Sequence, residues 1–140
     1  MKFAVLGPKA IVAGQITPAE VAEAAAQGVT AIVNNRPDGE EPGQPAGVEI
    51  EAAAKAAGLV YAHLPISAEL SSDKVDALRD LLAEAPGRVL LFCRSGTRSA
   101  YLWALARARD GMDPDEIVRR TAQAGYNVRP LLPWLKPRES

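Results

Sequence analysis

The residues best suited to chemistry form one short stretch, in which the only cysteine is followed by small, hydroxylated and basic residues. The stretch reads Cys93-Arg94-Ser95-Gly96-Thr97-Arg98-Ser99. An apolar run precedes Cys93 and a helix is predicted from Ser99, so the chain must turn tightly between them. Backbone N–H groups, the positive end of the helix and two guanidinium groups would then surround the sulfur and favour its thiolate form. The stretch therefore predicts a nucleophilic cysteine in an anion-binding loop.

The other residues of the loop fit a bound oxyanion. Arg98 can grip two oxygens of a tetrahedral oxyanion at once, which a lysine could not do. Gly96 permits a positive φ or a close backbone approach, and Ser99 is expected to cap the helix while its hydroxyl points toward the sulfur. We assign Cys93 and Arg98 as catalytic residues. The predicted substrate-binding residues of the loop are Arg94, Ser95, Gly96, Thr97 and Ser99.

A few polar residues outside the loop could also face the substrate. Arg36 follows a neighbouring predicted strand, and we expect it to bind substrate in the same crevice. His63 also ends a predicted strand, but it is interpreted as a surface or hydrogen-bonded histidine. The acidic residues Asp38, Glu40 and Glu41 are interpreted as a solvated turn.

The elements that position the loop alternate between strand and helix. Buried strands are predicted at 29–34, 59–64 and 88–92, and an edge hairpin at 3–6 and 10–14. Helices are predicted at 18–27, at 46–57, after Ser71 or Ser72, at 99–109 and from 114 toward Gly125. Thr17 to Glu20 forms a capping box with proline at the first helical position.

This alternation predicts an α/β fold with three layers, in which a mainly parallel, twisted sheet has helices on both faces. Ligands of such sheets bind outside the carboxyl ends of the strands, and Cys93 lies at such an end. The proline-rich tail is expected to cover the surface, and its Trp134 to pack or to form a contact between copies in a possible homo-oligomer.

Composition limits the partners. The 140 residues are expected to form a single domain over 1–140, and a formal net charge of -1 offers no attraction for nucleic acid or anionic membrane. One cysteine and one histidine make neither an internal disulfide nor an ordinary zinc site, so neither a metal nor a cofactor is expected. Without a targeting or membrane-spanning segment, the expected location is cytoplasmic.

Four stretches carry a resemblance to a known family. They are residues 12–17, residues 33–40, residues 61–66 and the Cys93 loop. Almost the whole chain resembles the DUF442 family, a phosphatase-like domain that is also found fused to β-lactamase-like hydrolases. The resemblance implies a fold like that of dual-specificity phosphatases, with Cys93 as the nucleophile, Arg98 as the anion-binding arginine and Ser99 as the hydroxyl residue after it.

Two departures from the phosphatase pattern favour a different reaction. Four residues separate Cys93 from Arg98, as in rhodaneses, whereas tyrosine phosphatases have five. In phosphatases, the loop after the preceding strand supplies an aspartate as the general acid. The corresponding loop of this chain reads Ser67-Ala68-Glu69 instead. The main prediction is therefore a rhodanese-like sulfurtransferase that carries sulfur as a Cys93 persulfide, takes it from an oxyanion donor such as thiosulfate, and passes it to an external thiol or protein acceptor.

Two alternatives stay open. The first is a cysteine-based phosphatase with a Cys93 phosphocysteine intermediate, in which Glu69 or Asp38 could replace the missing acid. The second is a non-catalytic module that binds oxyanions.

Overall fold

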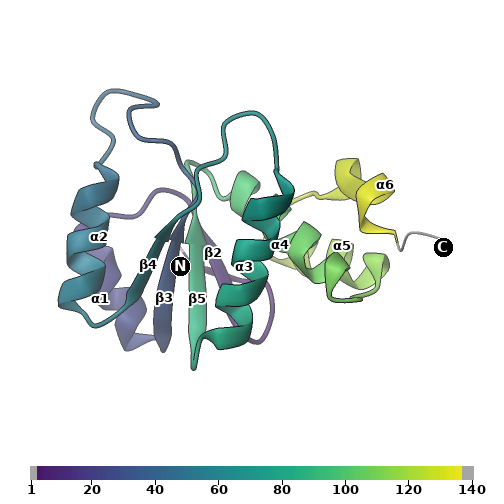
Figure 1. The fold of residues 1–140 in the computed structure, drawn as a ribbon, viewed down its shortest axis with the longest axis horizontal. Coiled ribbons are helices and arrows are strands. Elements are labelled where there is room, and N and C mark those ends of the chain that lie inside the picture. Colours follow the sequence, from purple (N-terminus) through teal and green to yellow (C-terminus); the bar gives the residue numbers. More distant parts are fainter. Residues whose placement is uncertain (1–2, 137–140) are drawn as a thin grey trace.

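The computed structural model describes residues 3–136 and places one twisted five-stranded sheet at the centre of the molecule (Figure 1). The strands are β1 (Ala4–Val5), β2 (Ala10–Ala13), β3 (Val29–Asn34), β4 (Val60–His63) and β5 (Arg88–Phe92), in the spatial order β1-β2-β5-β3-β4. β5 pairs in parallel with both β2 and β3, and β3 pairs in parallel with β4. Only β1 runs antiparallel to its neighbour, which confirms the predicted edge hairpin.

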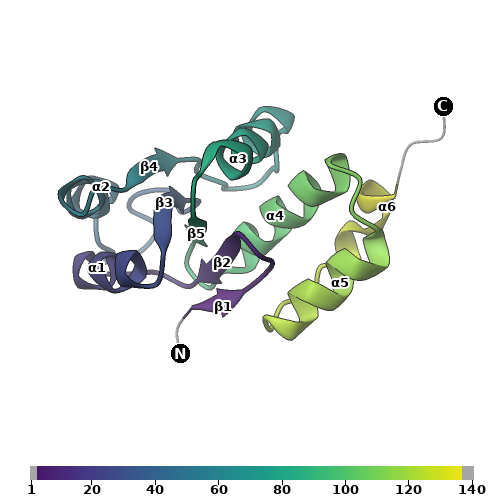
Figure 2. The same ribbon diagram turned by 90° about the horizontal axis from the view of Figure 1, so that it is seen from below.

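Helices cover both faces of the sheet. They are α1 (Pro18–Ala26), α2 (Gly47–Ala56), α3 (Ser72–Glu84), α4 (Thr97–Arg109), α5 (Pro114–Gln123) and α6 (Leu132–Leu135), with the short 3-10 helix η1 (Arg129–Leu131) before the last. α1 and α2 pack together on one face, while α3 and α4 pack together on the other (Figure 2). α5 and α6 lie against the outer side of α4. The predicted three-layer α/β fold is confirmed.

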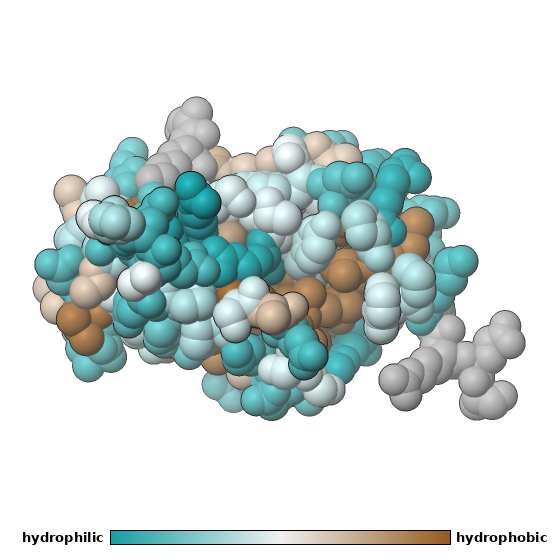
Figure 3. Space-filling model, turned by 90° about the horizontal axis from the view of Figure 1, so that it is seen from above, coloured by the Kyte–Doolittle hydropathy of each residue, from teal (hydrophilic) through white to brown (hydrophobic). Residues whose placement is uncertain are grey.

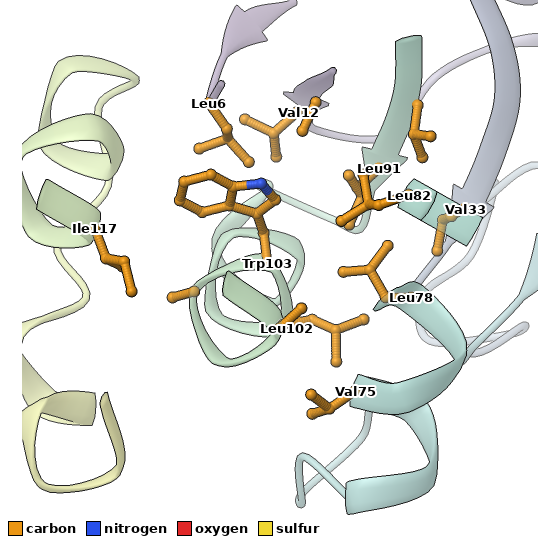
Figure 4. Packing of buried hydrophobic residues seen from close by; sticks show 14 of the residues in the cluster. Leu6, Val12, Val33, Val75, Leu78, Leu82, Leu91, Leu102, Trp103 and Ile117 are labelled. Carbon is orange, nitrogen blue, oxygen red and sulfur yellow. The ribbon is translucent and has the colours of Figure 1, made fainter. Parts of the chain in front are cut away.

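The central strand has a hydrophobic core on each side. Val89 and Leu91 face the core under α3 and α4, whereas Leu90 and Phe92 face the core under α1 and α2, as the two-residue period of a strand requires. Trp103 of α4 is 1% exposed and fills the space between the β1–β2 hairpin and α5 (Figure 4). β5 is thus paired on both edges and packed on both faces, so the position of its carboxyl end is well defined.

Local signals in the sequence set several helix boundaries. At the start of α1, the Glu20 N–H donates to the Thr17 hydroxyl and the Thr17 N–H donates to the Glu20 carboxylate, so the predicted capping box is present. The helix after the cysteine loop starts at Thr97, two residues earlier than predicted, because Gly96 at φ +96° turns the chain into α4 directly.

Up to residue 136, the C-terminal tail lies against α4, in agreement with the prediction that it covers the surface. Leu131 and Leu135 are buried in the core beside α4, while Trp134 is 68% exposed, so its predicted packing within the monomer is wrong. Within residues 3–136, no helix combines the length and the apolarity that a membrane crossing requires.

Candidate active site

Cys93 follows directly on the last residue of β5 and lies between the ends of its two neighbouring strands. The sulfur-bearing residue is fully buried. On the β3 side, the Asn35 N–H donates to the Phe92 carbonyl at 2.8 Å. On the β2 side, the Gln15 N–H donates to the Arg94 carbonyl at 3.1 Å. The predicted position of Cys93 at the carboxyl edge of a parallel sheet is confirmed.

The loop after Cys93 turns a backbone amide toward the sulfur. The Gly96 N–H donates to Cys93 Sγ at 3.1 Å. Because the next residue begins α4, the positive end of that helix also lies beside the sulfur. Both features stabilise negative charge on the sulfur or on an anion above it.

The close approach of β2 to this loop depends on Gly14. A Cβ atom at that position would lie 2.9 Å from the Arg94 carbonyl oxygen, a distance that side chains do not tolerate against backbone. Glycine therefore lets the end of β2 support the loop. This residue belongs to the motif around 12–17 that carried the family resemblance.

Ser99 differs from its predicted role. Its hydroxyl donates to Asn35 Oδ1 at 2.8 Å, and the Asn35 amide donates to the Leu64 carbonyl at 2.9 Å. Ser99 and Asn35 are both fully buried. Ser99 therefore neither caps α4 nor points at the sulfur, because the helix has already begun and the buried Asn35 oxygen needs a donor. It ties α4 to the ends of β3 and β4.

Arg98 is held by two partners from other elements. Its Nη1 donates to Glu40 Oε2 and to the Ile66 carbonyl, both at 2.7 Å, and its Nη2 donates to Glu40 Oε1 at 2.8 Å. These bonds use both hydrogens of Nη1 and one of Nη2. The Nε hydrogen and the second Nη2 hydrogen form a second bidentate edge, which the contacts with Glu40 and Ile66 do not use.

Arg36 also binds Glu40 and so helps to hold Arg98. It is 1% exposed, and its Nε, Nη1 and Nη2 donate to Glu40 at 2.9 Å, to Gln15 at 3.0 Å and to Glu41 at 2.8 Å. Glu41 also lies 3.3 Å from the exposed Arg94. The two glutamates were predicted to form a solvated turn. Both residues do lie exposed in a turn, but the prediction missed that the buried Arg36 guanidinium pairs with both carboxylates.

The charges of this cluster reinforce one another. The Arg98 guanidinium, helped by Arg36, lowers the pKa of Glu40 from 4.5 to about 2. The hydrogen bonds to Glu40 in turn raise the pKa of Arg98, and the charge of Cys93 acts in the same direction. Burial alone would lower the pKa of Arg36, but its bonds to Glu41 and Glu40 outweigh burial and raise it.

A cavity of about 260 Å³ opens over this charged cluster. Its lining residues are Arg36, Glu40, Glu41, Arg94 and Arg98. The structure therefore brings the three predicted arginines to one place. Among residues 3–136, no group of three or more histidine, cysteine or acidic side chains could hold a metal ion.

Asp38 and Glu69, the two predicted candidates for a general acid, differ in their surroundings. Asp38 accepts the Gly47 N–H at 2.7 Å, at the start of α2, and so caps that helix. Glu69 is exposed in the loop after β4, three residues beyond the Ile66 carbonyl that holds Arg98. Asp38 is therefore tied to the start of α2, whereas Glu69 lies in an exposed loop.

Sequence reasoning missed three residues of this site. Glu40 could have been found from its spacing of four from Arg36, which suits an ion pair. Asn35 directly follows a predicted strand, as Cys93 does. Tyr126, whose hydroxyl donates to the Ser95 carbonyl at 3.0 Å, gave no signal, because it lies 31 positions away in the chain.

Comparisons with known proteins identify the family. Residues 2–110 match the family described as "Beta-lactamase hydrolase-like protein, phosphatase-like domain". The beta-lactamase hydrolase-like protein of Agrobacterium fabrum is 39% identical over 138 residues, which are 97% of this chain and 32% of that protein. The chain spans about a third of the length of the curated relatives it matches.

Solved structures agree with this family. A Neisseria meningitidis protein that is provisionally assigned as a phosphatase is 35% identical, covers 97% of both chains and has a TM-score of 0.84. The kinase associated phosphatase is only 13% identical, but it superimposes with a TM-score of 0.70 over 89% of this chain and 82% of its own. The second likeness shows the fold alone, and it confirms the predicted phosphatase-like architecture.

These comparisons contradict the sequence-based prediction of a sulfurtransferase. The matched family is phosphatase-like, and so is the Neisseria structure that matches along the whole chain. The prediction gave the length of one loop more weight than the rest of the chain. A residue count also misses the early start of α4 at Thr97, which brings the helix terminus up to the sulfur. The alternative prediction of a cysteine-based phosphatase fits the comparisons.

Proposed function

Because this chain belongs to the phosphatase-like domain family of the beta-lactamase hydrolase-like proteins, we propose that it is a phosphatase that acts through a phosphocysteine on Cys93. The observation that carries the proposal is the Gly96 N–H that donates to the Cys93 sulfur, in a loop whose Arg98 is held by Glu40. An activated thiolate and a fixed anion-binding group are what such a reaction requires.

The proposed reaction has two steps. The Cys93 thiolate attacks phosphorus, so that a sulfur–phosphorus bond forms while the bond from phosphorus to the leaving oxygen breaks, and that oxygen takes up a proton. Water then attacks the phosphocysteine, the sulfur–phosphorus bond breaks, and inorganic phosphate leaves as the thiolate returns. The loop amides and Arg98 bind the non-bridging oxygens throughout.

Arg98 is suited to this role by the way Glu40 holds it. Glu40 and the Ile66 carbonyl bind the Nη1 side of the guanidinium. The remaining edge, made of Nε and Nη2, matches the spacing of two phosphoryl oxygens. In this proposal Arg36 does not contact substrate but holds Glu40 in place, which modifies its predicted role. Arg94 and the backbone of residues 95–97 complete the anion site.

Glu69 is the proposed general acid. It is exposed, and it belongs to the loop that contacts Arg98 through Ile66. Protonation of the leaving oxygen matters most for substrates whose leaving group is strongly basic.

Part of the surface on the same side of the molecule as the site is apolar. Figure 3 shows the side at which β5 passes into α4: hydrophilic side chains cover one part, and hydrophobic side chains line a hollow in the middle, toward the C-terminal helices. We therefore choose an aryl phosphate as the probe. The proposal also includes a cytoplasmic location and a small phosphorylated substrate, because a lone catalytic thiol stays reduced in that compartment.

The test is pre-steady-state hydrolysis of 4-nitrophenyl phosphate. We expect a burst of nitrophenolate equal to one equivalent of protein, followed by slower turnover. Cys93→Ser should abolish both phases, while Val48→Ala, an exposed position on α2, should change neither. Binding of phosphate without any turnover of the ester would overturn the proposal in favour of a non-catalytic oxyanion module.

A further inference from the structure

One peptide unit of the cysteine loop is held at both of its ends. The Gly96 N–H donates to Cys93 Sγ at 3.1 Å, and the Ser95 carbonyl, which belongs to the same planar unit, accepts the Tyr126 hydroxyl at 3.0 Å. In a trans peptide the N–H and the C=O point in opposite directions. A contact that fixes the carbonyl outward therefore fixes the N–H inward, toward the sulfur.

The same pattern holds along the loop. Three consecutive carbonyls each accept a hydrogen bond from a donor outside the anion site. The Arg94 carbonyl accepts the Gln15 N–H, and the Ser95 carbonyl accepts the Tyr126 hydroxyl. The Gly96 carbonyl accepts the Ala100 N–H. Two of these donors belong to the backbone. Only Tyr126 uses a side chain, so a single substitution can remove its contact.

This peptide unit needs such a contact because Gly96 gives it freedom. Gly96 has φ +96°, in the left-handed region, and glycine adopts either sign of φ with little cost. Rotation of the 95–96 peptide would withdraw the amide from Cys93 and turn the Ser95 carbonyl oxygen toward the sulfur. A carbonyl dipole in that orientation repels both a thiolate and a bound oxyanion.

Tyr126 is well anchored for this purpose. Its backbone N–H donates to the Thr121 carbonyl at 2.8 Å, just after α5, and its ring packs against the core beside α4. The ring also lies directly on Gly96, since a Cβ there would fall 2.1 Å from the Tyr126 oxygen. Burial, with the nearby Cys93 charge, raises the pKa of the Tyr126 phenol above its ordinary value of 10.0, so the hydroxyl keeps the proton it donates.

We propose that Tyr126 is a positioning residue that locks the 95–96 peptide with its amide toward Cys93 and so keeps the loop in its anion-binding state. The residue lies outside the stretch 2–110 that matches the family, in a segment that packs on the outer side of α4. The consequence for catalysis rests on the proposed phosphatase function. The consequence for the ionisation of Cys93 does not.

The test is therefore an ultraviolet titration of the Cys93 thiolate, which needs no substrate. Cys93 is the only cysteine, so Cys93→Ser supplies the blank. Tyr126→Phe keeps the ring and removes only the donor. Loss of one hydrogen bond should lower the thiolate fraction about three- to tenfold below the midpoint, which raises the titration midpoint by about half to one pH unit. Tyr101→Phe, a half-buried tyrosine of α4, is the matched control and should leave the midpoint unchanged.

A second variant tests the geometry. Gly96→Ala should displace Tyr126, so the addition of Tyr126→Phe to Gly96→Ala should raise the midpoint no further. Calorimetric titration with inorganic phosphate should show about three- to tenfold weaker binding for Tyr126→Phe. An unchanged midpoint in Tyr126→Phe, or an equal change in Tyr101→Phe, would overturn the proposal. A raised midpoint in a protein that does not hydrolyse aryl phosphates would overturn the proposed function and leave the positioning role intact.

Discussion

Glu40→Gln is the substitution that most sharply tests how Arg98 is held. Glu40 accepts one hydrogen bond from Arg36 and two from Arg98, and glutamine has nearly the same size but no charge. The amide would also place a donor group against a guanidinium. The change therefore removes the ionic link between the two arginines with little change in packing.

The size of the effect follows from the pKa of Glu40. A pKa of about 2 instead of 4.5 corresponds to roughly 3 kcal/mol in favour of the folded state at neutral pH, because each pKa unit is worth about 1.4 kcal/mol. The Glu40 side chain is 28% exposed, so solvent screens part of this energy, and we expect a loss of about 1 to 2 kcal/mol in Glu40→Gln.

The pH dependence has a definite sign. Because folding lowers the pKa of Glu40, its contribution is complete above about pH 4.5 and disappears as the pH falls through about 2. The stability difference between wild type and Glu40→Gln should therefore shrink to less than half its neutral value by about pH 3.

Urea unfolding at several pH values between neutral and pH 3 measures this difference. Glu51→Gln is the matched control, because Glu51 pairs with the exposed Lys55 on α2 and should contribute less than about 0.5 kcal/mol. Turnover of the aryl phosphate by Glu40→Gln should fall about ten- to a hundredfold, since Arg98 loses its alignment. A stability difference that is the same at pH 7 and pH 3, or no larger than that of Glu51→Gln, would refute this account of the cluster.

Three further substitutions test separate parts of the site. Gly14→Ala places a Cβ 2.9 Å from the Arg94 carbonyl, so urea unfolding should show a loss of about 1 to 3 kcal/mol, and retention of wild-type stability would contradict the close approach. Ser99→Ala leaves the buried Asn35 oxygen without its donor. The free energy of unfolding in urea should therefore fall by about 1 to 2 kcal/mol, and an unchanged urea midpoint would argue against the buried hydrogen bond. Glu69→Gln should slow hydrolysis of phenyl phosphate about a hundredfold or more while 4-nitrophenyl phosphate is affected far less, and equal effects on both esters would exclude Glu69 as the acid.

Most of the fold could be predicted because its signals are local. The β-branched run at β3, the apolar run at β5 and the capping box at Thr17 each specify an element from a few adjacent residues. Their alternation then fixes a parallel sheet, and with it the place of Cys93 at the carboxyl edge. The start of α4 was misplaced because Gly96 enters the helix from a left-handed conformation, which the sequence does not specify.

The partners of the catalytic loop could not be predicted in the same way. Glu40 looked like part of a solvated turn because exposed acidic residues beside glycine usually are. Glu40 does lie exposed in that turn, but its carboxylate also pairs with the buried Arg36 and with Arg98, which is 58 positions away in the chain. Tyr126 reaches Ser95 through the packing of α5 on α4, a tertiary contact without a local sequence signal.

The choice between sulfur and phosphoryl transfer shows a different limit. Loop length and the absence of an aspartate are properties of a few residues, and they pointed to sulfur. The family match extends over residues 2–110 and points to a phosphatase-like domain. The loop nevertheless contains the atoms that react, so the identity of the transferred group has to be measured on Cys93 itself.

The most direct measurement is the intact mass of the protein after rapid acid quench with 4-nitrophenyl phosphate, run beside an identical sample with thiosulfate. The account predicts that wild type gains the mass of one phosphoryl group, that peptide mapping places it on Cys93, and that Cys93→Ser gains nothing. A Cys93 that gains one sulfur atom from thiosulfate and no phosphoryl group from the aryl phosphate would contradict it.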